Sequence, residues 1–352
     1  MARLSSSQRG VYVSIERLNR DDALSVYSRR GMRIRSLPAR TSFLALTFFF
    51  AFGSAQGKRA PSFDAKDLKV DGLVGKLRVN VKPQSQITVQ ISGQKARVDS
   101  MSVHPSGSTL VISGDTEDGV WDWHNWFDFS ENHNNSKALD VHVVVPKGTD
   151  VHVDDMVGDA TIGDIEGDIH FEAAASNATI GRTKDAHVSM AGSGKIMMAP
   201  IAGDLHIDIA GSGKIKAASA ANVHASVAGS GSAEVGPING GLHLDIAGSG
   251  DFSATKVNGP VHVDIVGAGS VNIPQGQANP LHVDIMGAGN FTFGGLAVDP
   301  HISAVGSGRV KLRSYQGKMN SDGMVDVQVG PEGFPAPPAP PAPPAPPAPK
   351  VH

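Results

Sequence analysis

One nine-residue segment recurs along the chain, and its spacing constrains the fold more than any other feature. The segment is Leu205-His-Ile-Asp-Ile-Ala-Gly-Ser-Gly213, and close copies begin at Leu242, Val261 and Leu281. Between residues 187 and 301 the histidines of successive copies lie 19, 18, 19, 19, 20 and 19 residues apart. A fixed period of about 19 residues on a β-type pattern is typical of a solenoid, in which each repeat forms one coil.

The alternation within one copy indicates which side chains face the interior. Successive side chains of a strand point to opposite faces, so Leu205, Ile207 and Ile209 are expected to face inward. His206 and Asp208 then face outward. The Gly-Ser-Gly that follows is a predicted corner, because glycine accepts a positive φ and has no Cβ to collide with the previous coil. One coil cannot bury its apolar side alone, so neighbouring coils must stack.

We therefore predict an all-β fold, a parallel β-solenoid with coils of about 19 residues and no helix after the leader. Residues 56–149 contain further alternating segments and are expected to form an N-terminal β cap region and the first coils. A polar and aromatic insertion interrupts them at 118–136. Residues 150–330 are expected to form the solenoid repeats and a C-terminal cap.

The two ends of the sequence differ in composition from the repeats. Basic residues, a ten-residue apolar run at 43–52 and small residues at 53–55 predict that residues 32–55 are a signal peptide; the alternative is an uncleaved anchor. We interpret residues 1–31 as an upstream extension from a mis-assigned start codon. Residues 331–352 repeat Pro and Ala every three residues, which predicts a disordered tail of polyproline II type.

Charge and cysteine content exclude several classes of function. The formal net charge is -3, which argues against a nucleic-acid partner or an anionic membrane surface. Cysteine is absent, so disulfides, thiolate metal sites and a cysteine nucleophile are excluded. No stretch other than the leader approaches the apolar character of a transmembrane helix.

The outward histidines are weak candidates for metal ligands. Stacked coils would place them about 4.8 Å apart, so neighbouring imidazoles could share Zn²⁺ or Ni²⁺. A metal site needs three or four convergent ligands, whereas a flat column offers two. We therefore favour a solvated ladder in which each histidine stacks and bonds to Asp or Ser, and we predict no cofactor and no catalytic residue. The candidates, each followed two residues later by Asp, are His206, His243, His262 and His282.

A cluster of aromatic residues within the insertion is a candidate contact site. Aromatic faces beside acidic groups suit contact with a sugar or a protein. The alternative is that the insertion packs over the flank or the end of the solenoid. The cluster holds all three tryptophans of the chain and consists of Trp121, Trp123, Trp126, Phe127 and Phe129.

The chain resembles a known family at several places. Phe63-Asp-Ala-Lys-Asp-Leu-Lys-Val70, the strand patterns at 77–81 and 87–91, and the Ala-Gly-Ser-Gly repeats are similar to the bacterial GIN domain family, the auto-transporter adhesin head domains. The resemblance covers about residues 63–329. It implies a single-stranded right-handed β-helix in the cell envelope or outside the cell, and it brings no catalytic residues.

These observations predict an exported, non-enzymatic module for binding or adhesion, located in the periplasm, on the outer surface or secreted. Its expected partner is a glycan or protein of the envelope or surface. One alternative is a polysaccharide-active β-helix enzyme, which would need clustered Lys, Arg and carboxylates in a groove. Another is a structural scaffold polymer of the envelope.

Overall fold

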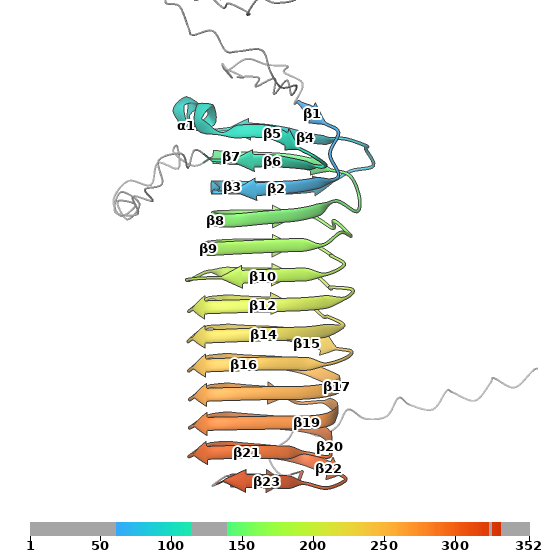
Figure 1. Cartoon of the computed structure of the whole chain (residues 1–352), viewed down its shortest axis with the longest axis vertical. Helices are drawn as coiled ribbons and strands as arrows, with labels where there is room; N and C mark the ends of the chain where they lie inside the picture. The colour runs from blue at the N-terminus through green and yellow to red at the C-terminus, as the bar shows by residue number, and fades with distance from the viewer. Residues whose placement is uncertain (1–60, 115–138, 324–325, 332–352) are drawn as a thin grey trace, which may run out of the picture. The chain divides into compact units, whose positions relative to one another are not determined.

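A computed structural model describes residues 61–114, 139–323 and 326–331, which form a stack of β coils (Figure 1). The predicted β-solenoid is confirmed. The expectation that no helix occurs is wrong at one place, the six-residue helix α1 (Lys95–Ser100). None of its residues is buried, so it lacks the apolar stripe by which sequence patterns reveal a helix.

Each repeat coil has two main strands and a short third side. The first strand of each coil from β8 to β21 carries the histidine, Asn320 takes its place in β23, and these strands pair in parallel to form one continuous sheet. The shorter strands of this sheet are β10 (Ala186–Met190), β12 (Asp204–Gly211), β14 (Asn222–Gly229), β16 (Leu242–Gly248), β21 (His301–Gly306) and β23 (Asn320–Gly323).

The second strand of each coil follows the glycine corner and belongs to a second parallel sheet. Its strands are β11 (Lys195–Met198), β13 (Lys214–Ala217), β15 (Ser232–Ile238), β18 (Ser270–Ile273), β20 (Asn290–Val298), β22 (Arg309–Gln316) and β24 (Asp326–Val329). Four longer strands continue around a corner from one side of the coil to the next: β8 (Asp150–Ile162), β9 (Ile169–Ile180), β17 (Asp251–Gly267) and β19 (Gly276–Gly287).

Equivalent residues of successive coils are register partners. His206 of β12 pairs with His187 of β10 on one side and with His224 of β14 on the other. In Figure 1 the labelled strands in front run from right to left while the chain descends, so the winding is right-handed. This is the hand expected for connections between parallel strands.

The N-terminal coils do not follow chain order. Strand β2 (Asp67–Asp71) lies between β6 (Thr109–Ser113) and β8, and β3 (Val74–Val81) lies between β7 (Leu139–Val145) and β8. The coil formed by β6 and β7 therefore lies at the N-terminal end of the stack, although β2 and β3 precede it in the sequence. Antiparallel strands cover its edge, which would otherwise expose unpaired backbone groups: β5 (Ser102–Ser106) on β6, β4 (Ile87–Ser92) on β7, and β1 (Ser62–Phe63) on β4.

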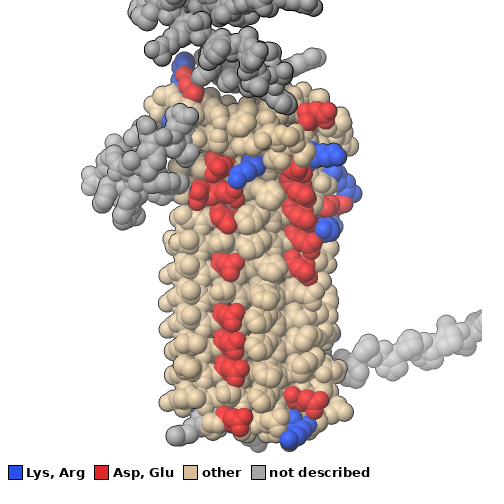
Figure 2. Space-filling view, in the orientation of Figure 1, with Lys and Arg blue, Asp and Glu red and all other residues tan. Residues whose placement is uncertain are grey.

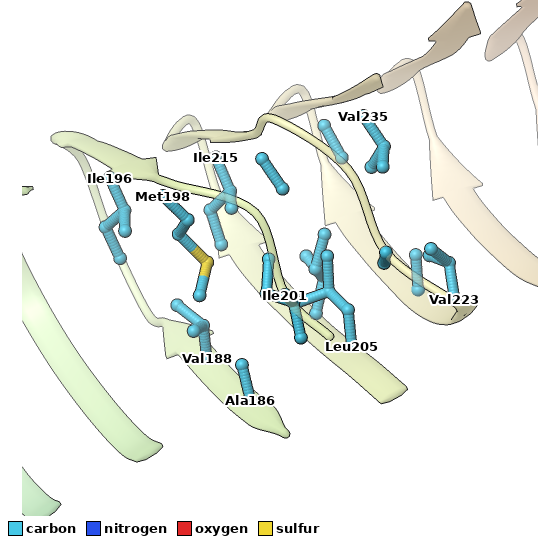
Figure 3. Packing of buried hydrophobic residues seen from close by; sticks show 14 of the residues in the cluster. Ala186, Val188, Ile196, Met198, Ile201, Leu205, Ile215, Val223 and Val235 are labelled. Carbon is cyan, nitrogen blue, oxygen red and sulfur yellow. The ribbon is translucent and has the colours of Figure 1, made fainter. Parts of the chain in front are cut away.

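The interior of the stack is apolar, and one core runs through all the coils. Leu205, Ile207 and Ile209 are buried and the two residues between them are exposed, as the alternation predicts. Figure 3 shows the buried side chains of successive coils pointing into the space between the two main sheets. Apolar side chains contributed by neighbouring coils therefore pack against each other along the axis.

The glycine corner is required for steric reasons. Gly211 has a φ of +132°, and a Cβ built there would lie 2.7 Å from the carbonyl oxygen of Gly192 in the previous coil. The second glycine of the corner leaves room for an apolar side chain: a Cβ on Gly231 would lie 2.5 Å from Cγ2 of Ile209. Both glycines thus allow the coils to approach at the sheet spacing.

The C-terminal end of the stack carries polar side chains on its last strands, β23 and β24, most of which are exposed. Within the described residues there is no helix of the length and apolar character needed to cross a bilayer. The predicted signal peptide, the insertion at 118–136 and the tail after residue 331 fall outside the described residues. The boundaries proposed for those segments stay predictions.

Candidate binding surface: the histidine face

The sheet that contains β10, β12 and β14 presents a single column of histidines, and we call its outer surface the histidine face. Backbone pairing places every member of the column beside the equivalent residue of the next coil. The predicted alignment is therefore confirmed. The histidine column consists of His152, His170, His187, His206, His224, His243, His262, His282 and His301.

The imidazole rings of the column follow one another at centroid separations of 4.3–5.9 Å; six neighbouring pairs are stacked and two are tilted. The ring centroids of His224 and His243 are 4.3 Å apart, and those of His243 and His262 are 4.9 Å apart with an interplanar angle of 3°. These separations follow from the spacing of about 4.8 Å between hydrogen-bonded strands. The column is thus a stack fixed by the backbone.

Two residues beyond each histidine lies a column of acids and serines. The carboxylate of Asp245 lies 3.4 Å from Nε2 of His243, and that of Asp264 lies 3.1 Å from Nε2 of His262. Asp208 lies 3.5 Å from Nε2 of His187, one coil earlier. The acidic members of this column, which we call the acidic column, are Asp71, Asp154, Glu172, Asp208, Asp245, Asp264, Asp284 and Asp322.

Burial and crowding favour the uncharged form of part of the histidine column. The pKa of His187 is lowered from its usual value, first by burial and then by the positive charge that His170 would carry. The pKa of His224 is lowered in the same way, by burial and by its neighbours His243 and His206. Protonating either of these two rings would bring like charges together with its stacked neighbours, which favours the neutral form of His187 and His224.

A second file of carboxylates borders the histidine column on its other side, and Figure 2 shows uncharged side chains between the two acidic files below their upper end. Its carboxylates accept hydrogen bonds from the backbone of the next coil. Oδ1 of Asp150 accepts from the N–H of Asp168, and Oδ1 of Asp185 accepts from the N–H of Asp204, both at 2.8 Å. The Asp204 N–H, followed by Lys184, lowers the pKa of Asp185. We call this file the capping column.

The histidine face also carries an outward apolar column. Its residues lie four positions after each of the last six histidines, and they are larger in the three C-terminal coils than in the three before them. Val266, Met286 and Val305 are 54%, 62% and 65% exposed. The column consists of Ala210, Ala228, Ala247, Val266, Met286 and Val305. Sequence reasoning missed this column, although the Ala, Val or Met before each Gly-x-Gly corner is visible in the repeats.

A groove of about 490 Å³ follows the histidine column over five coils, from His206 to His282. Pro260 and Pro280 contribute to its lining on the side of the capping column. Asp204 is the carboxylate among the groove-lining residues, and the lining contains neither Lys nor Arg. The groove is therefore an elongated surface feature with little charge.

The four predicted metal candidates lie in the histidine column, but the structure does not draw them into a common site. Within the described residues, one group of three histidine and carboxylate side chains has all its ligand atoms within 4.8 Å of each other, and it consists of His170, Glu172 and His187. The sequence carried one clue: among the nine histidine coils, this is the one with Glu two residues after the histidine. The expectation that these four histidines form a solvated ladder, and are only weak candidates for metal ligands, stays a prediction. The aromatic candidates Trp121, Trp123, Trp126, Phe127 and Phe129 lie outside the described residues.

Comparison with solved structures finds similar chains with low sequence identity. A putative adhesin from Parabacteroides distasonis is 15% identical, with 78% of this chain and 98% of that chain covered and a TM-score of 0.37. A putative lipid binding protein from the same organism is 15% identical, with 76% and 92% covered and a TM-score of 0.35. A putative adhesin from Bacteroides fragilis is 16% identical, with 78% and 98% covered and a TM-score of 0.28.

No curated protein matches this chain. A family model described as "Putative auto-transporter adhesin, head GIN domain" matches residues 69–255. The match begins in β2, extends through the N-terminal coils and ends in β17, whereas the solenoid continues with the same register to β24. The match covers more than half of the chain and includes the first two of the four close copies of the repeat, so the chain belongs to the GIN domain family of adhesin heads.

Proposed function

We propose that this chain is an exported, non-enzymatic binding module whose histidine face contacts a glycan or protein of the cell envelope or surface. The observation that carries the proposal is the repetition of one set of outward side chains, at one position per coil, over nine coils. A catalytic site is a unique constellation, whereas a surface of repeated groups suits an extended partner that makes the same contact several times. The membership of the GIN domain family supports the same class of function.

The composition of the face indicates what kind of contact it makes. Imidazole rings offer hydrogen-bonding nitrogen atoms, the acidic column accepts hydrogen bonds, and Val266, Met286 and Val305 add exposed apolar area. Such a mixture of apolar and polar groups resembles the surfaces of ordinary non-obligate interfaces. The acidic column and the capping column both disfavour an anionic partner. We therefore expect the partner to carry neutral hydroxyl groups or basic groups on the contacted side.

The groove offers little support for the enzymatic alternative. Hydrolysis of a glycosidic bond uses a pair of carboxylates that flank the bond. The groove along the histidine column is lined by a single carboxylate, Asp204, whose Oδ1 accepts a hydrogen bond from the side-chain amide of Asn222. The groove therefore suits binding better than cleavage.

A binding assay with matched variants tests the proposal. Purified chain is applied to separated polysaccharide and protein fractions of the envelope, and retention is measured. We expect the triple variant Val266→Ser, Met286→Ser and Val305→Ser to lose retention, because it removes the exposed apolar column without touching the core. The control Lys216→Ser alters an exposed position on the second sheet and should bind normally. Equal retention of all proteins would refute the histidine face as the contact surface.

A deletion of residues 118–130 tests the aromatic cluster separately. If the deletion abolishes retention while the triple variant keeps it, the contact lies in the insertion and the proposal for the histidine face is wrong. We expect the reverse result. Cell fractionation of the native protein tests export: we expect it outside the cytoplasm, and a cytoplasmic location would contradict that part of the proposal.

A further inference from the structure

The N-terminal part of the histidine column differs from the rest because ligand-type atoms converge there. Nε2 of His170 lies 2.9 Å from Oε1 of Glu172, and the rings of His170 and His187 are 4.7 Å apart and within 11° of parallel. Asp154 of the preceding coil adds a carboxylate oxygen 3.9 Å from Nε2 of His170. This group draws on three consecutive coils, whereas the pairs farther along the column combine one histidine with one carboxylate.

Glutamate at position 172 explains the convergence. The position is Asp or Ser in the other eight histidine coils, and the glutamate side chain is one methylene longer than aspartate. In the next coil the equivalent residue is Ser189, which is small and uncharged. Glu172 therefore places a carboxylate oxygen within 4.8 Å of a ring nitrogen of both His170 and His187. The coil of His187 carries no carboxylate of its own in this column, although Asp208 of the following coil lies 3.5 Å from Nε2 of His187.

We propose that His170, Glu172 and His187 together bind one divalent transition-metal ion, with Zn²⁺ as the preferred ion. Two imidazole nitrogens and one carboxylate oxygen are a donor set suited to Zn²⁺, and a water molecule can complete the tetrahedron. This site is independent of the proposed function, because it requires no partner and lies N-terminal to the groove.

The distances are close to those that coordination needs. With metal–ligand bonds of about 2.1 Å, the donor atoms of a tetrahedral site lie ~3.4 Å apart. The three ligand atoms are already within 4.8 Å of each other. Because the lone pair of an imidazole nitrogen lies in the ring plane, the stacked rings of His170 and His187 must turn out of parallel for both nitrogens to bind the same ion. The side chains of His170, Glu172 and His187 are 31%, 46% and 39% exposed, which leaves them free to rotate and accessible to the ion.

The electrostatic surroundings favour a cation. The carboxylates of Glu172 and Asp154 lie 2.9 and 3.9 Å from Nε2 of His170. Nζ of Lys69 is engaged by Oδ2 of Asp154 at 2.8 Å. The second oxygen of Asp154 faces His170 and is placed to accept a hydrogen bond from a metal-bound water or to orient a ligand.

Isothermal titration of the untagged, metal-free full chain with Zn²⁺ tests the proposal. We expect one ion per chain. Glu172→Gln or His187→Ser should weaken Zn²⁺ binding by at least about tenfold, because loss of a group that only orients a ligand already costs about that much. The matched control is His243→Ser, which removes a histidine of the same column from a pair with no third ligand. It should bind Zn²⁺ as the unaltered chain does.

The outcomes separate a built site from general adsorption. Absence of binding by the unaltered chain overturns the proposal, and so does unchanged binding by Glu172→Gln, because the ion is then held elsewhere. Equal losses in Glu172→Gln and His243→Ser would show adsorption along the whole column and would also overturn it. Glu172→Gln keeps the size of the side chain at an exposed position, and unchanged far-ultraviolet dichroism verifies its fold. As a second readout, Zn²⁺ should raise the Tm of the unaltered chain and leave that of Glu172→Gln unchanged.

Discussion

The inward and outward assignments of one coil lead to a sharp contrast between two substitutions three residues apart. Ile246 is 2% exposed, and its methyl group occupies the space over which the corner glycine Gly269 of the next coil passes. His243 lies on the outer surface with its side chain 36% exposed. We expect Ile246→Asp to unfold the middle coils and His243→Ser to leave them nearly unchanged.

The size of the effect follows from what each substitution removes. Burying the isoleucine side chain contributes about 1.5–3 kcal/mol. Placing an unpaired carboxylate in the same apolar space costs at least a further ~2 kcal/mol, because the group must be desolvated or protonated. The sum of at least about 4 kcal/mol is a large part of the stability of an ordinary domain. His243→Ser loses ring stacking and an exposed contact with Asp245, together below about 1 kcal/mol.

Urea unfolding followed by circular dichroism measures both losses of free energy, and amide hydrogen exchange shows where the loss occurs. A solenoid is stabilised by contacts between neighbouring coils, so Ile246→Asp should increase exchange first in β14, β16 and β17. Ile246→Val serves as a control that removes one methylene and should cost about 0.5–1.5 kcal/mol. Equal losses from Ile246→Asp and His243→Ser would refute the assignment of inside and outside.

Three further predictions concern the corner, the histidine column and the capping column. Gly211→Ala should destabilise the protein by about 2 kcal/mol or more, because the new Cβ meets a backbone carbonyl at a positive φ, whereas Gly107→Ala, with open space around it, should cost only about 1 kcal/mol; thermal unfolding compares them. The folded-state pKa values of His187 and His224 are lowered, so the unfolded chain binds more protons below the usual histidine pKa of 6.5. The Tm should therefore fall as the pH drops from 7.5 through 6.5, and a Tm that stays constant or rises would contradict the stacking of neutral rings. Asp185→Ala should lower the Tm more than Asp185→Asn, because the amide oxygen can still accept the hydrogen bond from the next coil; equal losses would mean that the hydrogen bond is unimportant.

The repeats could be predicted from the sequence because two periods act together. Alternation of two places Leu205 inside and His206 outside, and the period of 19 then aligns each residue with its equivalent in the next coil. The corner glycines were predictable as well, because a Cβ at the corner would collide with the previous coil. Apolar alternation carries no information about which strand becomes the neighbour, so the position of β2 and β3 between β6–β7 and β8 could not be deduced.

The candidate site was only partly predictable for a related reason. The histidine column follows from the register, but the convergence of His170, Glu172 and His187 depends on side-chain length and on the serine in the following coil. Those contacts occur in one coil only. A prediction that assumes identical coils cannot include them. The hydrogen bonds that Asp150 and Asp185 accept from the next coil likewise depend on the path of the short third side of each coil. The alternation pattern does not determine that path.

Distances between introduced labels test the stacking of coils most directly. The chain contains no cysteine, so pairs can be introduced without a background. One spin label at His206→Cys is combined in turn with a label at His262→Cys, His282→Cys or His301→Cys, which lie three, four and five coils away. Stacked coils predict backbone separations of about 14, 19 and 24 Å, increasing by ~4.8 Å per coil. Separations that do not increase in equal steps would contradict the solenoid.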